Sequence, residues 1–345
     1  MVTTLKVGTR GSALALAQTE QVLKKLKAIH PNLNFVIVPI KTAGDRISSA
    51  AELRTAGKGL FVKEIERALL ARKVSLAVHS MKDLPSELAE GLAIGAVPER
   101  EDASDVFIGR NAVPIEKLPP RSRVGTSSLR RQAVLKSLLP HLEFVELKGN
   151  LDTRLEKLKS PRQNLAGIVV AAAGLKRLYP QNGIPVQTLP RDKVVPAAGQ
   201  GALALEIRSN DEATRKLLAP IHHPPTAACV EAERELQRRL EGGCQVPLGA
   251  HAEISDDGVI KLTACLASLD GRRVVRESQA GMMDNPKGVA EALETILVSR
   301  GAREILDSCR PRAARARPRP HRNGQHRRPR ARRASRPRRK ARSRR

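Results

Sequence analysis

Short apolar runs alternate with longer amphipathic stretches over the first third of the chain. The runs have the composition of strands, whereas the stretches repeat their apolar residues at helical spacing. The predicted elements are a strand at 5–8, a helix at 12–29 with Ser12 as its cap, a strand at 35–40, a helix at 61–71 and a strand at 76–78. This order predicts a mostly parallel sheet.

The same alternation continues through the middle third. The predicted elements are strands at 105–108, 123–125, 143–147, 168–172 and 202–207, with helices after Ser128 and after Asp152. The last of these strands follows a proline-rich stretch at 189–196. A strand so late in the chain could return to the first sheet, which would make the first domain discontinuous.

The pattern changes in the last third. The predicted elements are a charged helix at 226–240, a loop at 240–247, alternating strands near 251–254, 259–267 and 273–279, and a closing helix at 286–299. Asp-Gly pairs at 257–258 and 270–271 suit the turns of antiparallel hairpins. We therefore expect a small α+β domain, with helices on one face of a three-stranded antiparallel sheet.

The length of 345 residues, 41% of them apolar, is sufficient for several hydrophobic cores. The predicted fold class is α/β with an additional small α+β domain. The predicted domains are an α/β lobe at 1–99 and 199–218, a second α/β lobe at 104–194, the α+β domain at 221–308 and a basic tail at 310–345.

Positive charge is concentrated at the end of the chain. The net charge is +27, and residues 310–345 hold 18 Lys or Arg and no acidic residue, which leaves +9 on residues 1–309. We expect the Arg-Pro-Ala tail to be disordered, because it has almost nothing to bury. A nucleic-acid-binding arm and an out-of-frame translation of GC-rich DNA would both give this composition. The body remains basic enough to attract an anionic small molecule.

The chain begins without the basic and apolar segments of a signal peptide, and no apolar run reaches the ~18 residues of a membrane span. We therefore expect a cytoplasmic protein. The cysteines, at 229, 244, 265 and 309, form no close pair and have no spacing with histidine that suits zinc. We expect neither a disulfide framework nor a metal site.

Hydroxyl, glycine and basic residues follow directly after several predicted strands. These segments lie at 9–12, 41–44, 79–83 and 125–131. Because ligands of α/β sheets bind at the carboxyl ends of strands, the segments predict an anion-binding cleft. The adjacent Arg130 and Arg131 could instead be a solvated helix face. If they bind ligand carboxylates rather than hold the fold, their replacement by Leu should leave the melting temperature nearly unchanged.

Asp83 and Cys244 are the candidate chemical groups. Asp83 lies in a turn before Pro85, where it could cap the turn or could stabilise positive charge on a substrate. Cys244 follows two glycines and precedes Pro247, in a loop that can face a cleft. A small buried side chain is the alternative interpretation of this cysteine.

Several motifs resemble those of the hydroxymethylbilane synthase family, also called porphobilinogen deaminases. They are VHSMKDLP at 78–85, VGTSSLRRQ at 124–132, GN at 149–150, TRL at 153–155, AGLKRL at 173–178 and LEGGCQVP at 240–247. The resemblance runs in order from about residue 5 to about residue 306. It implies two lobes like those of periplasmic binding proteins, a third domain that carries the cysteine, and a monomer.

The resemblance also implies a reaction. Four porphobilinogen units would lose ammonia and join head to tail on a dipyrromethane cofactor, which is held by a thioether to Cys244, and water would release hydroxymethylbilane. Asp83 would lie beside the pyrrole nitrogens. The implied carboxylate-binding and neighbouring groups are Arg10, Ser12, Lys58, Ser80, Lys82, Thr126, Ser128, Arg130, Arg131, Lys148, Arg154, Arg177 and Gln200. Lys148 replaces the arginine that is usual in the family, so it keeps the charge but lacks the planar fork.

Three other functions compete with this one. A two-lobed ligand-binding protein would have the same cleft without a need for Cys244. A nucleic-acid-binding protein is suggested by the tail alone, since one Tyr, four Phe and no Trp leave few stacking surfaces. A cysteine hydrolase would need a base such as His222 or His223, and it would leave the arginine-rich cleft unexplained.

Overall fold

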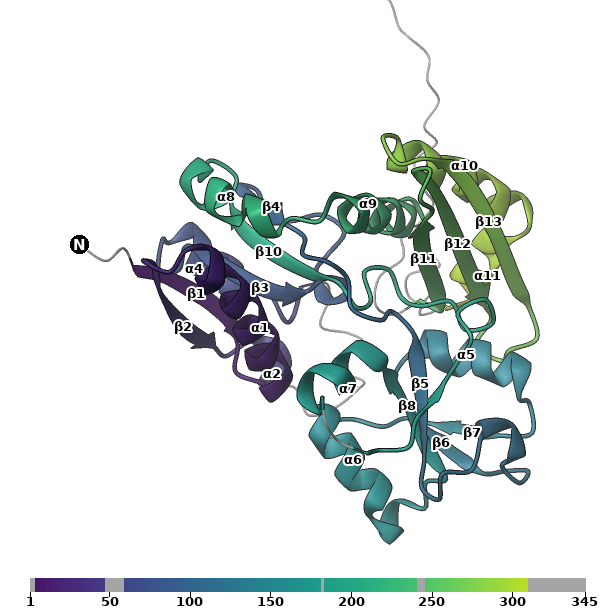
Figure 1. Cartoon of the computed structure of the whole chain (residues 1–345). Helices are drawn as coiled ribbons and strands as arrows, with labels where there is room; N and C mark the ends of the chain where they lie inside the picture. Colours follow the sequence, from purple (N-terminus) through teal and green to yellow (C-terminus); the bar gives the residue numbers. More distant parts are fainter. Residues whose placement is uncertain (1–3, 47–58, 181–182, 241–245, 310–345) are drawn as a thin grey trace, which may run out of the picture. The chain divides into compact units, whose positions relative to one another are not determined.

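The computed structural model describes residues 4–46, 59–180, 183–240 and 246–309. The chain divides into two units, residues 1–309 and residues 310–345. The described residues all belong to the first unit, and the predicted disorder of the tail lies outside them. They form two five-stranded sheets and one three-stranded sheet (Figure 1).

The first sheet has the strand order β2-β1-β3-β10-β4. Its elements are β1 (Thr4–Arg10), α1 (Ala13–Ile29), β2 (Asn34–Ile40), α2 (Ala43–Arg46), α4 (Lys63–Leu70), β3 (Leu76–Ser80), the 3₁₀ turn η1 (Met81–Asp83), β4 (Leu92–Ala96), β10 (Leu203–Arg208), α8 (Glu212–Leu218) and the 3₁₀ turn η4 (Ala219–Ile221). β1 runs parallel to β2 and β3, whereas β10 is antiparallel to β3 and β4. The late strand therefore does return to the first sheet.

The second sheet has the order β7-β6-β8-β5-β9. Its elements are β5 (Asp105–Gly109), η2 (Ile115–Lys117), β6 (Arg123–Gly125), α5 (Leu129–Leu138), β7 (Glu143–Val145), α6 (Leu151–Lys159), η3 (Pro161–Gln163), β8 (Gly167–Ala171), α7 (Ala172–Leu178) and β9 (Gln187–Thr188). β6 is parallel to β7 and β8, but β5 is antiparallel to β8 and β9. In each of these two sheets four of the five strands run in the same direction, and only β10 or β5 runs against them, so the expectation of a mostly parallel sheet is confirmed.

The third sheet is antiparallel in the order β11-β12-β13. Its elements are α9 (Pro224–Arg239), β11 (Leu248–Ile254), β12 (Val259–Ala267), β13 (Val274–Met282), α10 (Pro286–Ser299) and α11 (Ala302–Cys309). α9 contacts β11 and α10 contacts β13 (Figure 1). The predicted α/β class with a small α+β part is thus confirmed, while the predicted domain boundaries stay a prediction.

Each sheet has its own apolar core. Val7, Leu76 and Leu205 are fully buried in the first, and Leu262 and Leu293 in the third. The third sheet also joins the core of the second, because Cys265 and Ala267 of β12 pack with residues of α5. The described candidate site residues lie at strand ends, in turns and in the helices next to these sheets.

Candidate active site

Asp83 ends the short turn η1, directly after the buried strand β3. It is half-buried and lines a pocket together with Arg10, Ser12 and Ser80. Among the described residues, the Asp83 carboxylate makes no hydrogen bond and no ion pair, so the turn-cap interpretation has no support there. A carboxylate that faces a pocket without such a partner can act on a bound cationic group.

The backbone of the Asp83 turn is held by the segment that precedes β10. Met81 N donates to Ala202 O at 3.0 Å. Gly199 has a φ of +71°, and a Cβ there would lie 2.6 Å from Met81 Cγ and 3.2 Å from Lys82 N. Glycine is therefore required for this close approach, since it alone tolerates both the conformation and the contact.

Arg10 is fixed at the end of β1. Its Nε and Nη2 donate to Asp45 Oδ1 at 3.1 and 2.5 Å, and its Cζ lies 4.2 Å from the centre of the Phe61 ring. Burial alone would raise the pKa of Asp45, but hydrogen bonds from Arg10 and Thr42 hold it below its usual value. The guanidinium is thus pre-oriented beside the pocket.

Two serines of the pocket have local structural partners. Ser12 Oγ accepts from Ala15 N at 3.3 Å as the N-cap of α1, as the sequence predicts. Ser80 Oγ exchanges hydrogen bonds of 2.9 and 3.1 Å with the Gln18 side chain. Both hydroxyls line the pocket, so each has a structural role and also borders the space where a ligand would lie.

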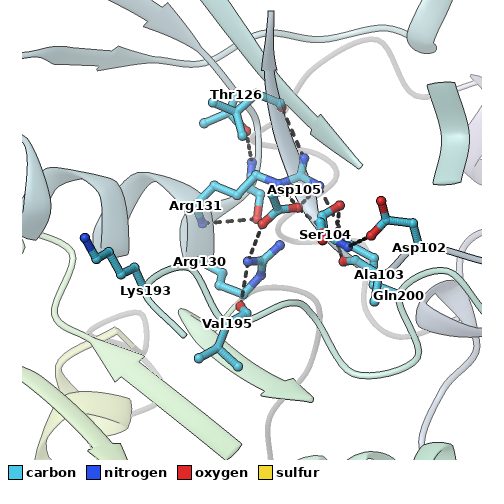
Figure 2. A network of polar contacts seen from close by, with 12 residues as sticks. Asp102, Ala103, Ser104, Asp105, Thr126, Arg130, Arg131, Lys193, Val195 and Gln200 are labelled. Atoms are coloured by element: carbon cyan, nitrogen blue, oxygen red, sulfur yellow. Dashed lines mark hydrogen bonds and ion pairs between the residues drawn. The ribbon is translucent and has the colours of Figure 1, made fainter. Parts of the chain in front are cut away.

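Arg130 and Arg131 are buried, with only 4% and 6% of their surfaces exposed. Arg130 Nη1 donates to Asp105 Oδ2 at 2.7 Å and to Val195 O at 2.8 Å, and Arg131 Nε donates to Asp105 Oδ1 at 2.9 Å. Figure 2 shows both side chains turned toward this carboxylate. The interpretation of the pair as a solvated helix face is therefore wrong.

Gln200 completes this buried network. Its Nε2 donates to Asp105 Oδ1 at 2.8 Å and to Ala103 O at 2.6 Å, and its Oε1 accepts from Arg131 Nη2 at 3.3 Å (Figure 2). Burial would raise the pKa of Asp105, but the two guanidinium groups hold it well below its usual range. Asp105 therefore stays ionised and neutralises one of two positive charges.

The charge of Lys82 is affected by Asp83 and by the buried group of Arg130, Arg131 and Asp105. Burial lowers its pKa to about 8, Asp83 and Asp105 oppose that change, and Arg131 and Arg130 reinforce it. The ammonium therefore loses its proton near pH 8, well below the range of an ordinary lysine.

Arg154 and Arg177 donate hydrogen bonds to backbone or amide oxygens, so each could still bind an anion. Arg154 Nε donates to Gly149 O at 2.8 Å, and burial together with the charge of Arg131 lowers its pKa to about 10. Arg177 donates to Gly201 O at 2.8 Å and to Gln21 Oε1 at 3.2 Å. Neither guanidinium forms an ion pair with a carboxylate within the described part of the chain.

The remaining predicted residues have mixed positions. Thr126 is fully buried, with its amide donating to Val145 O at 2.9 Å, and Ser128 caps α5 by accepting from Arg131 N at 3.4 Å. Lys148 is half-buried and precedes the start of α6. Cys244 and Lys58 lie outside the described residues.

Comparison with known proteins identifies the origin of this arrangement. Residues 5–216 match the family model described as porphobilinogen deaminase, dipyromethane cofactor binding domain, and residues 227–296 match the porphobilinogen deaminase C-terminal domain. The chain belongs to the porphobilinogen deaminase family. It is therefore an enzyme of tetrapyrrole biosynthesis that polymerises porphobilinogen, and the resemblance seen in its motifs is confirmed.

Curated relatives named porphobilinogen deaminase match this chain over nearly their whole length. The porphobilinogen deaminase of Syntrophobacter fumaroxidans is 47% identical over 88% of this chain and 97% of its own. That of Moorella thermoacetica is also 47% identical, over 88% of this chain and 95% of its own. Membership of this family favours the synthase over the three competing functions that the sequence left open.

Comparison with solved structures gives matches of low sequence identity and low TM-score. The methionine binding protein MetQ covers 63% of this chain and 89% of its own at 14% identity, with a TM-score of 0.39. The BenM effector binding domain covers 64% of this chain and 90% of its own at 13% identity, with a TM-score of 0.37.

None of the described helices combines the length and apolar character needed to cross a membrane.

Sequence reasoning missed the acidic partners of the family's arginines. Asp45 holds Arg10, and Asp105 holds both Arg130 and Arg131. Asp105 was visible only as the first residue of a predicted strand, a position where a polar residue is unremarkable. That Asp105 is fully buried opposite the Arg-Arg pair becomes apparent only when the relative position of β5 and α5 is known.

Proposed function

We propose that this chain deaminates porphobilinogen and joins four units head to tail, releasing linear hydroxymethylbilane by hydrolysis. The observation that carries the proposal is the Asp83 carboxylate, which lines a pocket with Arg10 and has no hydrogen-bond partner among the described residues. Family membership supplies the reaction class, and this carboxylate supplies a group suited to it.

Asp83 is the proposed catalytic residue. When porphobilinogen loses ammonia, positive charge develops on the carbon that carried the amine and is shared with the pyrrole nitrogen. A fixed carboxylate beside that nitrogen stabilises the charge, and it costs little reorganisation because the turn is already held by the backbone near Gly199. The aliphatic amine is an ammonium at neutral pH and leaves as ammonia, and this carboxylate can then accept the proton that the attacking pyrrole carbon loses when the new carbon–carbon bond forms.

The cations are proposed to bind the acetate and propionate groups of the pyrroles. Each added unit brings two carboxylates, so the demand for positive charge grows along the chain. Arg154 and Arg177 support this role because neither is paired with a carboxylate in the described residues. Arg130 and Arg131 retain one net positive charge beside Asp105 and contribute at short range.

Further donors to the pyrrole carboxylates are proposed on the same basis. They are Ser12, Ser80, Lys82, Thr126, Ser128, Lys148 and Gln200. Their hydroxyl, ammonium and amide groups lie at strand ends, in turns or at helix starts. Lys58 is assigned from its position in the sequence alone. The predicted domain boundaries, the monomeric state, the cytoplasmic location and nucleic-acid contact by the tail stay predictions.

The residues fit a dipyrromethane, the cofactor named for the matched family domain. A molecule of two pyrroles with four carboxylates needs a carboxylate near its nitrogens and several guanidinium groups, which Asp83, Arg10, Arg154 and Arg177 can provide. When bound, it supplies the pyrrole carbon to which the first porphobilinogen unit is joined. Cys244 is the proposed point of attachment, through a thioether.

The intact mass of the purified chain, measured alongside porphobilinogen consumption, tests this assignment. We expect active protein to be heavier than its sequence by one dipyrromethane, with the added mass on the peptide that contains Cys244. Cys244→Ala should lose the adduct and the activity together, whereas Cys265→Ala should keep both. Active protein of bare mass, or an adduct on Cys229 or Cys265, would contradict the assignment.

A further inference from the structure

Arg234 connects helix α9 to the turn that follows Asp83. Its Nη2 donates to Pro85 O at 2.7 Å and to Ser86 O at 3.2 Å, and its Nη1 donates to Leu84 O at 3.4 Å. One planar guanidinium thus contacts three successive carbonyl groups, beginning one residue after Asp83. Such a contact fixes the path of the chain more firmly than a single hydrogen bond does.

These three carbonyls depend on Arg234. In the described part of the chain, no backbone N–H donates to Leu84, Pro85 or Ser86 O. Arg234 likewise makes no ion pair with a described carboxylate, although the charge of Glu206 acts on it at longer range. A half-buried guanidinium is therefore committed to the backbone of this turn, and its removal would leave both the carbonyls and the turn without that support.

The preceding residue of α9 acts on the other side of the same turn. Glu233 Oε2 accepts from Gly199 N at 2.7 Å, and the Gly199 backbone is the one that approaches Met81 and Lys82. Two consecutive residues of one helix therefore hold the segments on both flanks of Asp83. Glu233 also binds Arg100 and Ala252 N, so it supports other contacts, whereas the described side-chain hydrogen bonds of Arg234 all go to residues 84–86.

We propose that Arg234 is a positioning residue that sets the place of the Asp83 carboxylate relative to α9. The inference rests on the proposed catalytic role of Asp83. In the sequence, α9 leads directly to the segment that holds Cys244. The helix before the attachment cysteine thereby also determines where the catalytic carboxylate stands, and the growing pyrrole chain must meet both.

A purely structural role would give a different pattern of effects. If Arg234 only stabilised the fold, its loss would lower the melting temperature and the amount of folded enzyme, but each folded molecule would turn over normally. If it positions Asp83, folded enzyme should bind porphobilinogen with little change and react slowly. Displacement of a catalytic group by about 1 Å can cost on the order of 10²-fold in rate.

The test uses the full chain with its cofactor and compares Arg234→Met, Arg234→Lys and Arg238→Met. Arg238 is the matched control, because it lies on the same helix, is 45% exposed and pairs with Glu235. We would measure kcat and KM for porphobilinogen, with the amount of active sites set by the mass of the bound cofactor, and the melting temperature of each variant.

We expect Arg234→Met to lower kcat by about 10- to 100-fold with KM within about 3-fold of wild type, while the cofactor adduct is retained. Arg234→Lys, which keeps a donor but not the fork, should recover part of kcat, and Arg238→Met should match wild type. If Arg234→Met fails to fold, Arg234→Lys carries the test, with a fall in kcat of at least about 3-fold expected.

Two results would overturn the inference: a normal kcat per loaded Arg234→Met or Arg234→Lys molecule, or an equal fall in kcat for Arg238→Met. Wild-type chain that carries no adduct and consumes no porphobilinogen would instead overturn the proposed function. The wild-type measurement therefore separates failure of the inference from failure of the function on which it rests.

Discussion

Arg130 Nη1 lies 2.7 Å from Asp105 Oδ2, and the carboxylate is completely buried. Arg131 approaches the other oxygen of the same carboxylate at 2.8 Å. The helix α5 and the strand β5 are thus joined by a buried arginine–aspartate–arginine group. The ion pairs of this group stabilise the fold, and its remaining positive charge favours the binding of a ligand anion. Ligand binding and stability are therefore linked at these arginines.

Replacement of Arg130 by Leu should destabilise the protein by about 3–5 kcal/mol, because Asp105 would lose a buried partner. Thermal and denaturant unfolding would measure the loss. The structure thus revises the expectation, drawn from the sequence, that the melting temperature would hardly change. Arg154→Leu is the control, since it removes a guanidinium without an ion pair among the described residues, and it should cost less. Equal stability of Arg130→Leu and wild type would contradict this account.

Asp83→Asn should reduce turnover by at least about 10²-fold, the scale of one lost catalytic group, because the amide keeps the size but not the charge. The free energy of unfolding should change little, since the carboxylate makes no hydrogen bond to a described residue. Steady-state kinetics on cofactor-loaded enzyme would measure the effect, with the exposed Asp256→Asn as control. Near-normal turnover in a folded Asp83→Asn enzyme would remove Asp83 from the mechanism.

Local patterns predicted the elements well where a segment is long or strongly periodic. The helix at 12–29 with its Ser12 cap and the strands of the third sheet appear close to their predicted places. The short strand β4 and the helix α7 were missed, because a few apolar residues fit either structure. The return of β10 to the first sheet was anticipated, but its antiparallel direction was not, because a hydrophobic pattern does not reveal strand direction.

The site divides in the same way. Asp83, Arg10 and Ser12 were found from their positions after strands, and the structure brings them to one pocket. The partners that orient the site were not found, because Arg234 contacts residues about 150 positions earlier in the chain. Such a contact depends on the packing of separate sheets, which no local pattern encodes.

Glu233 makes stability depend on pH. Burial would raise its pKa, but Arg100 and His251 lower it to about 2 in the folded protein, from an ordinary value of 4.5. A lowered carboxyl pKa contributes stability that is present above pH 4.5 and is lost as the pH falls toward 2. The contribution is on the order of 3 kcal/mol.

Unfolding by denaturant between pH 7 and pH 3 tests this contribution. Wild type should lose stability progressively below about pH 4.5. Glu233→Gln should be less stable at pH 7, because Arg100 loses its charged partner, and its stability should fall less steeply with acid. Glu253 also has a pKa lowered to about 2, so the difference between the two proteins, rather than either curve, isolates Glu233. Parallel curves would contradict the assignment.

Lys82 should make substrate binding sensitive to mildly alkaline pH. Burial lowers its pKa to about 8, so the ammonium is mostly protonated at pH 7 and mostly neutral at pH 9. If this cation helps to hold a pyrrole carboxylate, KM for porphobilinogen should rise as the pH passes 8, by roughly 3- to 10-fold, the net contribution of one ordinary hydrogen bond.

The matched variant for this effect is Lys82→Arg, because a guanidinium stays protonated over the whole range. Its KM should be nearly constant between pH 7 and pH 9, whereas that of wild type rises. Lys176→Arg serves as the control, because this lysine is 57% exposed and paired with Glu101. Burial alone would lower its pKa, but the hydrogen bond that Lys176 donates to Glu101 outweighs burial and raises it. This variant should leave the wild-type profile unchanged. If the alkaline rise in KM persists in Lys82→Arg, the titrating group is another one, and Lys82 does not bind the substrate as a cation.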